Sequence, residues 1–202
     1  MTAPGYRRGR VLLDELRPAG GQVATLAERL TDTEGLSGPE DPYAWLSCVL
    51  GLLSVNEGNY GVGAVVVRGG GIVAEGRNRL LWPRRNTSAH AEAEALDVFE
   101  ARFPELDSGR GTIMYTSLEC CPMCTVRLLN SGVRTVRYLA PDPDGGMFSR
   151  LDCLPPYWRR LAAGRTPVQT FEPSACAPAL SGIAADIFAA TETQLNERIV
   201  RS

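Results

Sequence analysis

The sequence lacks an apolar run of membrane-spanning length. Its most apolar stretch, from Tyr43 to Val55, is about thirteen residues long, whereas a transmembrane helix needs about 20. It also shows no secretory signal pattern, because the arginines at positions 7, 8 and 10 are followed only by a short apolar run and then by two acidic residues. We therefore expect a cytoplasmic protein without a membrane partner.

The sequence has little net charge as well. Its 21 basic and 23 acidic residues give a formal charge of -2, and arginines gather only in small clusters such as 84–85 and 159–160. A protein that grips long nucleic acid usually carries a basic stripe. The charge balance favours a small molecule as the partner and leaves nucleic acid as the less favoured alternative.

Histidine is scarcer still, since His90 is the only one, whereas cysteine is present six times. Three of the cysteines, Cys120, Cys121 and Cys124, lie within five positions. An even number of cysteines in a small secreted domain would suggest disulfides, but this chain is larger and shows no export signal. The grouping instead favours a metal or reactive site in a reducing compartment.

Hydrophobic periodicity and turn residues predict an alternating order of helices and strands after residue 40. The predicted elements are a helix from 41 to a stop near 58, strands at 62–67 and 72–75, a helix at 88–103, a strand at 112–118, a helix at 121–130, a strand at 133–140 and a helix at 179–199. The segment 142–174 is rich in proline and glycine and gives no clear prediction.

This order predicts an α/β fold with a mixed central sheet. The first two strands form a hairpin around three glycines, and the later strands alternate with helices, which favours parallel pairing with helices on both faces. Residues 1–40, with one short helix predicted at 22–30, are assigned to an N-terminal extension. Residues 41–202 are assigned to a single domain.

His90, Cys121 and Cys124 have the spacing of metal ligands. The two cysteines form the only Cys-x-x-Cys pair of the chain, at the start of a predicted helix. Residues three apart share one helix face, and the helix N-terminus favours thiolates. One histidine and two cysteines make three protein ligands for Zn²⁺, whereas a structural zinc site normally has four. The pattern therefore predicts a zinc site that keeps one position open for water.

Glu92 is the predicted catalytic residue, because a carboxylate beside such a site can carry protons between water and substrate. On an ideal helix two residues are about 200° apart, so His90 and Glu92 cannot share a helix face. Both reach one site only if the metal lies beside the first turn of the helix.

His-x-Glu followed by Pro-Cys-x-x-Cys is the pattern of zinc deaminases that act on bases. On this pattern, and on the segments 62–67, 76–79, 90–92 and 117–124, the sequence resembles the cytidine deaminase superfamily. It is most similar to the branch that contains cytosine, guanine and tRNA-adenosine deaminases. The resemblance covers about residues 41 to 150. It departs from the family at Cys120, where a proline is usual before the first ligand cysteine.

The resemblance implies a three-layer α/β/α sandwich, a homodimer, and Asn78 and Ala64 as substrate-binding residues. It implies a zinc-dependent hydrolase that converts an amino-substituted base, nucleoside or related heterocycle to the carbonyl product and releases ammonia.

Three alternatives remain open from the sequence. The substrate could be an adenosine of tRNA. The protein could instead be a non-catalytic binding module whose zinc site is closed by Cys120 or Cys153, although such a module does not explain Glu92. A thiol redox protein built on Cys121 and Cys124 would leave both His90 and Glu92 unexplained.

Overall fold

A five-stranded mixed sheet forms the centre of the molecule in a computed structural model that describes residues 3–16, 20–105 and 111–201. The strands are β1 (Gly63–Arg68), β2 (Gly71–Arg77), β3 (Thr112–Leu118), β4 (Thr135–Ala140) and β5 (Thr170–Pro173). Their order across the sheet is β2-β1-β3-β4-β5. β1 pairs antiparallel with both β2 and β3, whereas β3, β4 and β5 run parallel. The predicted mixed sheet is confirmed.

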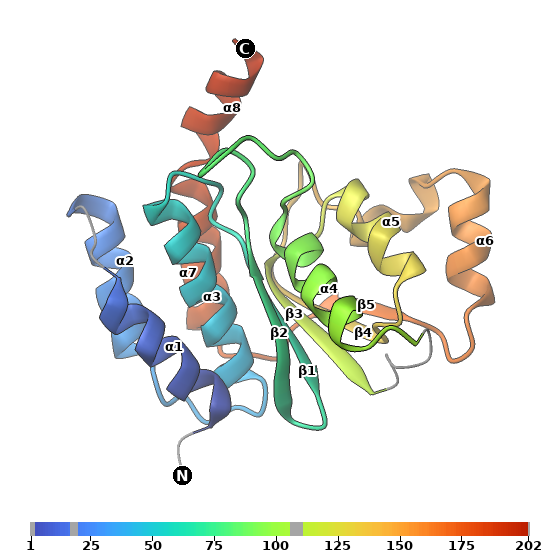
Figure 1. The fold of residues 1–202 in the computed structure, drawn as a ribbon, viewed down its shortest axis with the longest axis horizontal. Helices are drawn as coiled ribbons and strands as arrows, with labels where there is room; N and C mark the ends of the chain where they lie inside the picture. The colour runs from blue at the N-terminus through green and yellow to red at the C-terminus, as the bar shows by residue number, and fades with distance from the viewer. Residues whose placement is uncertain (1–2, 17–19, 106–110, 202) are drawn as a thin grey trace.

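Helices cover both faces of this sheet, as predicted for a three-layer α/β/α sandwich (Figure 1). α3 (Asp41–Asn56) and α7 (Pro178–Ala189) lie on one face, and α4 (Ala91–Arg102) and α5 (Pro122–Asn130) lie on the other. α3 is buried almost all round, because it packs against the sheet on one side and against further helices on the other. Apolar residues on every side of a helix are expected for such a central position.

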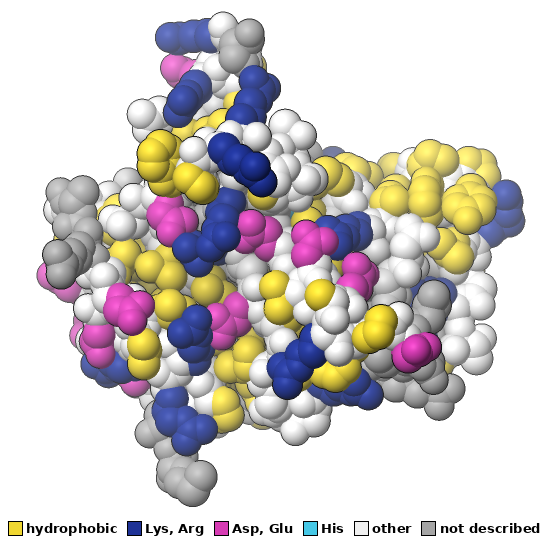
Figure 2. Space-filling view, in the orientation of Figure 1, with side chains coloured by type: hydrophobic (Ala, Val, Ile, Leu, Met, Phe, Trp, Pro, Cys, Tyr) yellow, Lys and Arg dark blue, Asp and Glu magenta, His cyan; other side chains and the backbone are white. Residues whose placement is uncertain are grey.

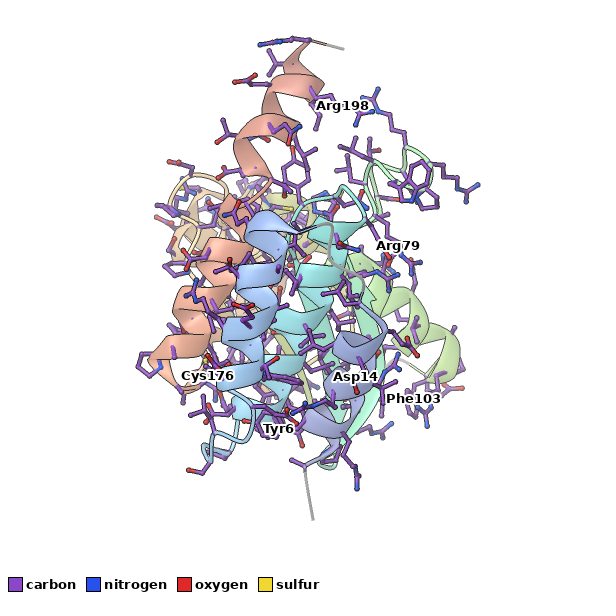
Figure 3. The ribbon with its side chains drawn as sticks, turned by 90° about the vertical axis from the view of Figure 1, so that its left-hand side faces the viewer. Tyr6, Asp14, Arg79, Phe103, Cys176 and Arg198 are labelled. Carbon is purple, nitrogen blue, oxygen red and sulfur yellow. The ribbon has the colours of Figure 1, made fainter. Side chains whose placement is uncertain are left out.

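Two N-terminal helices form an outer layer over α3 (Figure 3). They are α1 (Pro4–Glu15) and α2 (Gly21–Asp32). Tyr6, Leu12, Leu26 and Leu30 are buried in the same hydrophobic core as the sheet. The sequence predicted a helix near α2 but none at α1.

The helix predicted at 88–103 begins later than expected, at Ala91. Residues Asn86 to His90 form tight turns instead, in which the Ala89 amide donates to the Asn86 carbonyl and the His90 amide donates to the Ser88 carbonyl. His90 then adopts an extended conformation as the N-cap of α4. The predicted start of this helix at residue 88 was therefore three residues too early.

The C-terminal half differs most from the prediction. The segment 142–174 contains the 3₁₀ helix η2 (Phe148–Cys153), α6 (Pro156–Gly164) and β5. The single helix predicted at 179–199 is instead two helices, α7 and α8 (Glu192–Val200). The chain turns between them at Thr191, whose hydroxyl donates to the Asn59 carbonyl at 3.0 Å.

α6 buries none of its residues, and apolar side chains gather around it at the surface (Figure 2). Tyr157 is 59% exposed and packs edge-on against its neighbour Trp158. Within the described part of the chain, no helix has the length and apolar character that crossing a membrane would require.

Candidate metal centre and substrate cavity

The candidate site lies at the edge of the sheet where β3 ends and two helices begin. β3 runs into Glu119 and Cys120, and Cys121 is the N-cap of α5. His90 is the N-cap of α4 on the same face of the sheet. The positive ends of two helix dipoles therefore meet at this site, which favours anionic groups such as thiolates and carboxylates.

His90, Cys121 and Cys124 are brought together, as their spacing predicted. One ligand atom from each lies within 4.8 Å of the others, and Cys121 Sγ is 3.7 Å from His90 Nδ1. Within the described residues, no other histidine, cysteine, aspartate or glutamate joins this cluster. The alternative of a fourth ligand from Cys120 or Cys153 therefore finds no support in the geometry.

The surroundings of the two sulfurs shift their pKa values in opposite directions. A hydrogen bond from Cys124 lowers the pKa of Cys121 to about 4, with further help from His90. The same hydrogen bond, together with burial, raises the pKa of Cys124, and the contact with Cys121 raises the pKa of His90. A metal ion displaces protons from such groups, because thiolates and neutral imidazole are its ligands. One nitrogen and two sulfur donors at this separation fit zinc.

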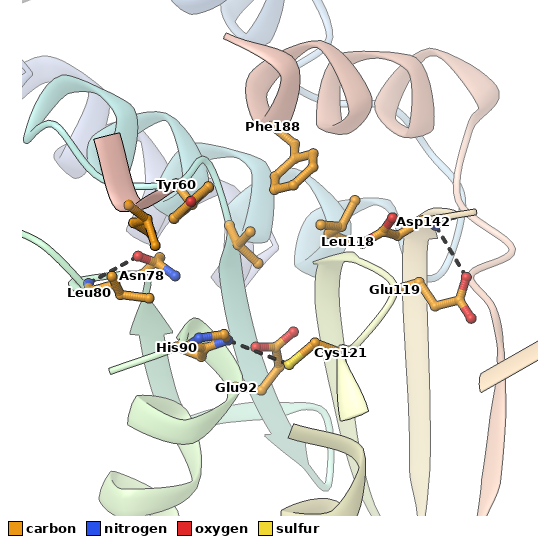
Figure 4. Close-up of a pocket in the computed structure, with 12 residues that line it drawn as sticks. Tyr60, Asn78, Leu80, His90, Glu92, Leu118, Glu119, Cys121, Asp142 and Phe188 are labelled. Atoms are coloured by element: carbon orange, nitrogen blue, oxygen red, sulfur yellow. Dashed lines mark hydrogen bonds between the residues drawn. The ribbon is translucent and has the colours of Figure 1, made fainter. Parts of the chain in front are cut away.

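Glu92 lies beside this cluster without being one of its members. Its side chain is only 4% exposed, and its Oε2 is 3.3 Å from Cys124 Sγ. The concern that His90 and Glu92 lie on different helix faces does not apply here, because His90 precedes the helix in extended conformation. Both side chains line the same cavity (Figure 4).

The cavity has a volume of about 240 Å³ and is mostly apolar. Its lining residues come from loops and helices on both sides of the sheet edge and comprise Tyr60, Val62, Asn78, Leu80, His90, Glu92, Leu118, Glu119, Cys121, Asp142, Phe188 and Ile199. A concave apolar site with a few convergent polar groups is typical of small-molecule binding.

The two predicted substrate-binding residues are placed differently. Asn78 lines the cavity, and its Oδ1 accepts a hydrogen bond from the Leu80 amide at 3.1 Å. Ala64 is fully buried within β1 and is not among the residues that line the cavity, whereas Val62 is.

Several lining residues were not predicted from the sequence. Glu119 is a buried acid whose two oxygens accept hydrogen bonds from the amides of Asp142, at 3.2 Å, and Ser149, at 3.0 Å. It thereby fixes the loop that brings Asp142 to the cavity. Phe188 and Ile199 come from the C-terminal helices, where no local sequence pattern distinguishes a cavity wall from ordinary core. The one signal available in the sequence was an acidic residue directly after a predicted apolar strand, and this signal points to Glu119.

Comparison with known proteins agrees with this arrangement. Residues 44–140 match the family described as the cytidine and deoxycytidylate deaminase zinc-binding region. The tRNA-specific adenosine deaminase of Bacillus subtilis is 38% identical over 92 residues, which are 45% of this chain and 55% of that protein. The guanine deaminase of the same organism is 38% identical over 86 residues, 41% of this chain and 51% of that protein. The chain thus spans about half the length of these curated relatives.

Similarity of fold extends beyond the matched segment. The solved structure of guanine deaminase from Nitrosomonas europaea superimposes with a TM-score of 0.56 over 88% of this chain and 97% of that one, at 20% identity. At this identity the likeness supports the fold alone. The family match and the three grouped ligands show that residues 44–140 contain a segment similar to the zinc-binding region of cytidine and deoxycytidylate deaminases, with His90, Cys121 and Cys124 placed to hold zinc.

Proposed function

We propose that the protein is a zinc-dependent hydrolytic deaminase of an amino-substituted base, nucleoside or related heterocycle. The observation that carries the proposal is the position of Glu92. This buried carboxylate sits against the His90, Cys121 and Cys124 cluster and reaches the cavity that a substrate would enter. A zinc site that only stabilised the fold would have no use for such a carboxylate.

The proposed reaction replaces an amino group on a ring carbon by oxygen. When bound, zinc supplies Lewis-acid activation, which lowers the pKa of water towards neutrality. Glu92 takes a proton from the attacking water and delivers it to the adjacent ring nitrogen. It then passes the second proton to the amino group as the carbon–nitrogen bond breaks, so ammonia leaves and a carbonyl remains.

The cavity walls suit a flat ring. Tyr60 and Phe188 stack on each other with ring centroids 6.3 Å apart, and both border the cavity. Asn78 brings an amide whose Oδ1 is held by the Leu80 amide, so its orientation is fixed before a substrate arrives. We propose that Asn78 binds the substrate base.

The proposal is tested by replacing Glu92 with Gln and measuring ammonia release. Purified protein is incubated with a panel of bases, nucleosides and a tRNA. We expect turnover of at least one small aminated heterocycle by the unaltered protein, and no measurable turnover by Glu92→Gln at equal zinc content. Retained turnover in that variant would exclude the proposed role of Glu92.

A tRNA adenosine is the second candidate substrate, because one of the curated relatives is named a tRNA-specific adenosine deaminase. The near-neutral charge of the chain favours a small substrate. The same panel separates the two candidates, since inosine in tRNA without turnover of any free base or nucleoside would favour the second.

We further propose a cytoplasmic homodimer in which residues 1–40 extend a deaminase domain formed by residues 41–202. The proposed dimer and its location rest on the resemblance to the superfamily. Light scattering of the purified chain tests the dimer, and a monomer at micromolar concentration would contradict it.

A further inference from the structure

The two oxygens of the Glu92 carboxylate have different surroundings. Oε1 is 3.0 Å from the Thr116 hydroxyl and 3.3 Å from the Cys120 sulfur. Oε2 is 3.3 Å from Cys124 Sγ. All three neighbours are buried, with Thr116 and Cys120 showing no exposed surface. Water therefore does not compete for Oε1, and the side chains around it decide its orientation.

Thr116 alone cannot hold Oε1 at all times. Its hydroxyl carries one proton and also lies 3.1 Å from the Leu118 carbonyl, which can only accept. When the proton is given to Leu118, none is left for Glu92. Cys120 has no such divided role, because among the described residues the one hydrogen bond of its sulfur goes to Glu92 Oε1.

Cys120 is the donor in its contact with Glu92 Oε1, and its side chain is fully buried. Cys120 also lies outside the cluster formed by His90, Cys121 and Cys124. It is therefore available as a donor while its two neighbouring cysteines serve as ligands.

Cys124 behaves in the opposite way. As a ligand it must be a thiolate, and a thiolate has no proton to give to Oε2. Filling the metal site therefore leaves Oε1 held by its two neighbours and frees Oε2. Oε1 is then fixed by its hydrogen-bond donors, whereas Oε2 is able to accept and release protons.

We propose that Cys120 and Thr116 are positioning residues for Glu92, which hold Oε1 so that Oε2 faces the reacting atoms. This inference rests on the proposed function. It assigns a task to the cysteine that stands where the family pattern has proline, a residue whose side chain could donate no hydrogen bond.

The test compares two variants at position 120 with one variant at position 48 and one at position 116, each loaded with zinc and checked for one metal per chain. Cys120→Ala removes the donor, and Cys120→Ser restores one as a hydroxyl. Cys48→Ala removes a fully buried thiol from α3, away from the site, and serves as the matched control. Thr116→Val removes the second neighbour of Oε1 at nearly constant volume.

We expect Cys120→Ala to lower kcat about ten-fold, since a hydrogen bond to a charged group is lost, with KM nearly unchanged. Cys120→Ser should regain most of that loss, and Thr116→Val combined with Cys120→Ala should lower kcat further. Cys48→Ala should leave kcat unchanged. A Cys120→Ala enzyme with the kcat of the unaltered protein would overturn the proposal, and so would a Cys120→Ser enzyme as slow as Cys120→Ala.

Vibrational spectroscopy tests the contact between Cys120 and Glu92 without any need for turnover. The S–H stretching band that disappears in Cys120→Ala should move to higher frequency in Glu92→Ala, because the thiol loses its acceptor. An unmoved band would overturn the contact and the proposal with it. If the unaltered protein deaminates nothing while the band does move, the proposed function fails and the link between Cys120 and Glu92 stands.

Discussion

At the scale of single residues, protons and a zinc ion compete for the same ligand atoms. The contacts with Cys124 and His90 lower the pKa of Cys121 and so stabilise one thiolate in advance. One of the two ligand cysteines is therefore a thiolate before zinc binds. What remains is to remove a proton from Cys124 and to keep His90 neutral.

This competition predicts that zinc binds more tightly as the pH rises. The pKa of Cys124 and the pKa of His90 are both raised, so at low pH each holds a proton that zinc must displace. The pKa of Cys121 is lowered to about 4, so this residue adds almost no pH dependence near neutrality. Zinc affinity measured by competition with a chromophoric chelator should be at least ten-fold higher at about pH 8 than at about pH 6. Equal affinities at the two pH values would contradict the raised pKa values of Cys124 and His90.

At the scale of elements, α1 shows how packing can override helix propensity. The sequence gives this segment glycines at positions 5 and 9, which disfavour a helix interior. In the structure both glycines face α3. A Cβ at Gly9 would lie 2.4 Å from Cζ3 of Trp45, a fully buried ring whose Nε1 donates to the Leu30 carbonyl. The absence of a side chain is what allows the two helices to approach.

Replacing Gly9 with Ala should therefore destabilise the protein, although alanine is the better helix former. Overpacking costs about 1–3 kcal/mol, which exceeds the gain in helix propensity of about 1 kcal/mol. Gly182→Ala is the matched control, because Gly182 lies within α7 with nothing near its missing Cβ. Urea unfolding should show a loss for Gly9→Ala and a small gain for Gly182→Ala. A gain in both would mean that α1 does not pack this closely.

α8 is the element that completes the cavity from the C-terminal end. Tyr60 donates to Asn196 Oδ1 at 2.6 Å, and Thr191 donates to the Asn59 carbonyl, so one short segment before β1 holds the helix at two points. Ile199 is thereby placed against the cavity. Its apolar side chain therefore lines the space that the proposed substrate would enter.

Ile199→Ala should accordingly raise KM several-fold and leave kcat nearly unchanged, because it removes binding that the ground state and the transition state share. Val200→Ala is the control, since Val200 is 85% exposed and does not line the cavity. Steady-state kinetics with the best substrate of the panel decides the matter. A fall in kcat without a change in KM would instead indicate that α8 positions the catalytic groups.

At the scale of the whole molecule, what the sequence could predict depends on how local the signal is. The strand at 112–118 and the ligands 90, 121 and 124 were predicted because alternation and ligand spacing are properties of a few neighbouring residues. α1 was missed because its glycines make sense only once α3 is beside them. Asp142, Phe188 and Ile199 reach the cavity from segments whose meeting no single stretch of sequence encodes.

The places of the metal ligands and of the buried core predict how the molecule responds to loss of the metal. The ligands join the starts of α4 and α5 on one face of the sheet, while both helix layers bury large side chains of their own, such as Trp45 and Ile187 on one face and Phe99 and Leu128 on the other. Zinc therefore adds stability by mass action, RT ln(1 + [Zn]/Kd), to a core that is already formed. This differs from zinc fingers, which have no fold without the ion.

Chelation should thus lower Tm by several degrees and leave the far-UV circular dichroism spectrum nearly unchanged at 25 °C. The reason is that the apo protein stays folded and loses only the stabilisation that zinc binding adds. His90→Ala should melt close to the chelated protein, with or without added zinc, since one of three ligands is gone. Refilling the chelated protein should restore the original Tm. Complete loss of helix signal on chelation would contradict this view, because it would mean that the metal, and not the two helix layers, holds the sheet together.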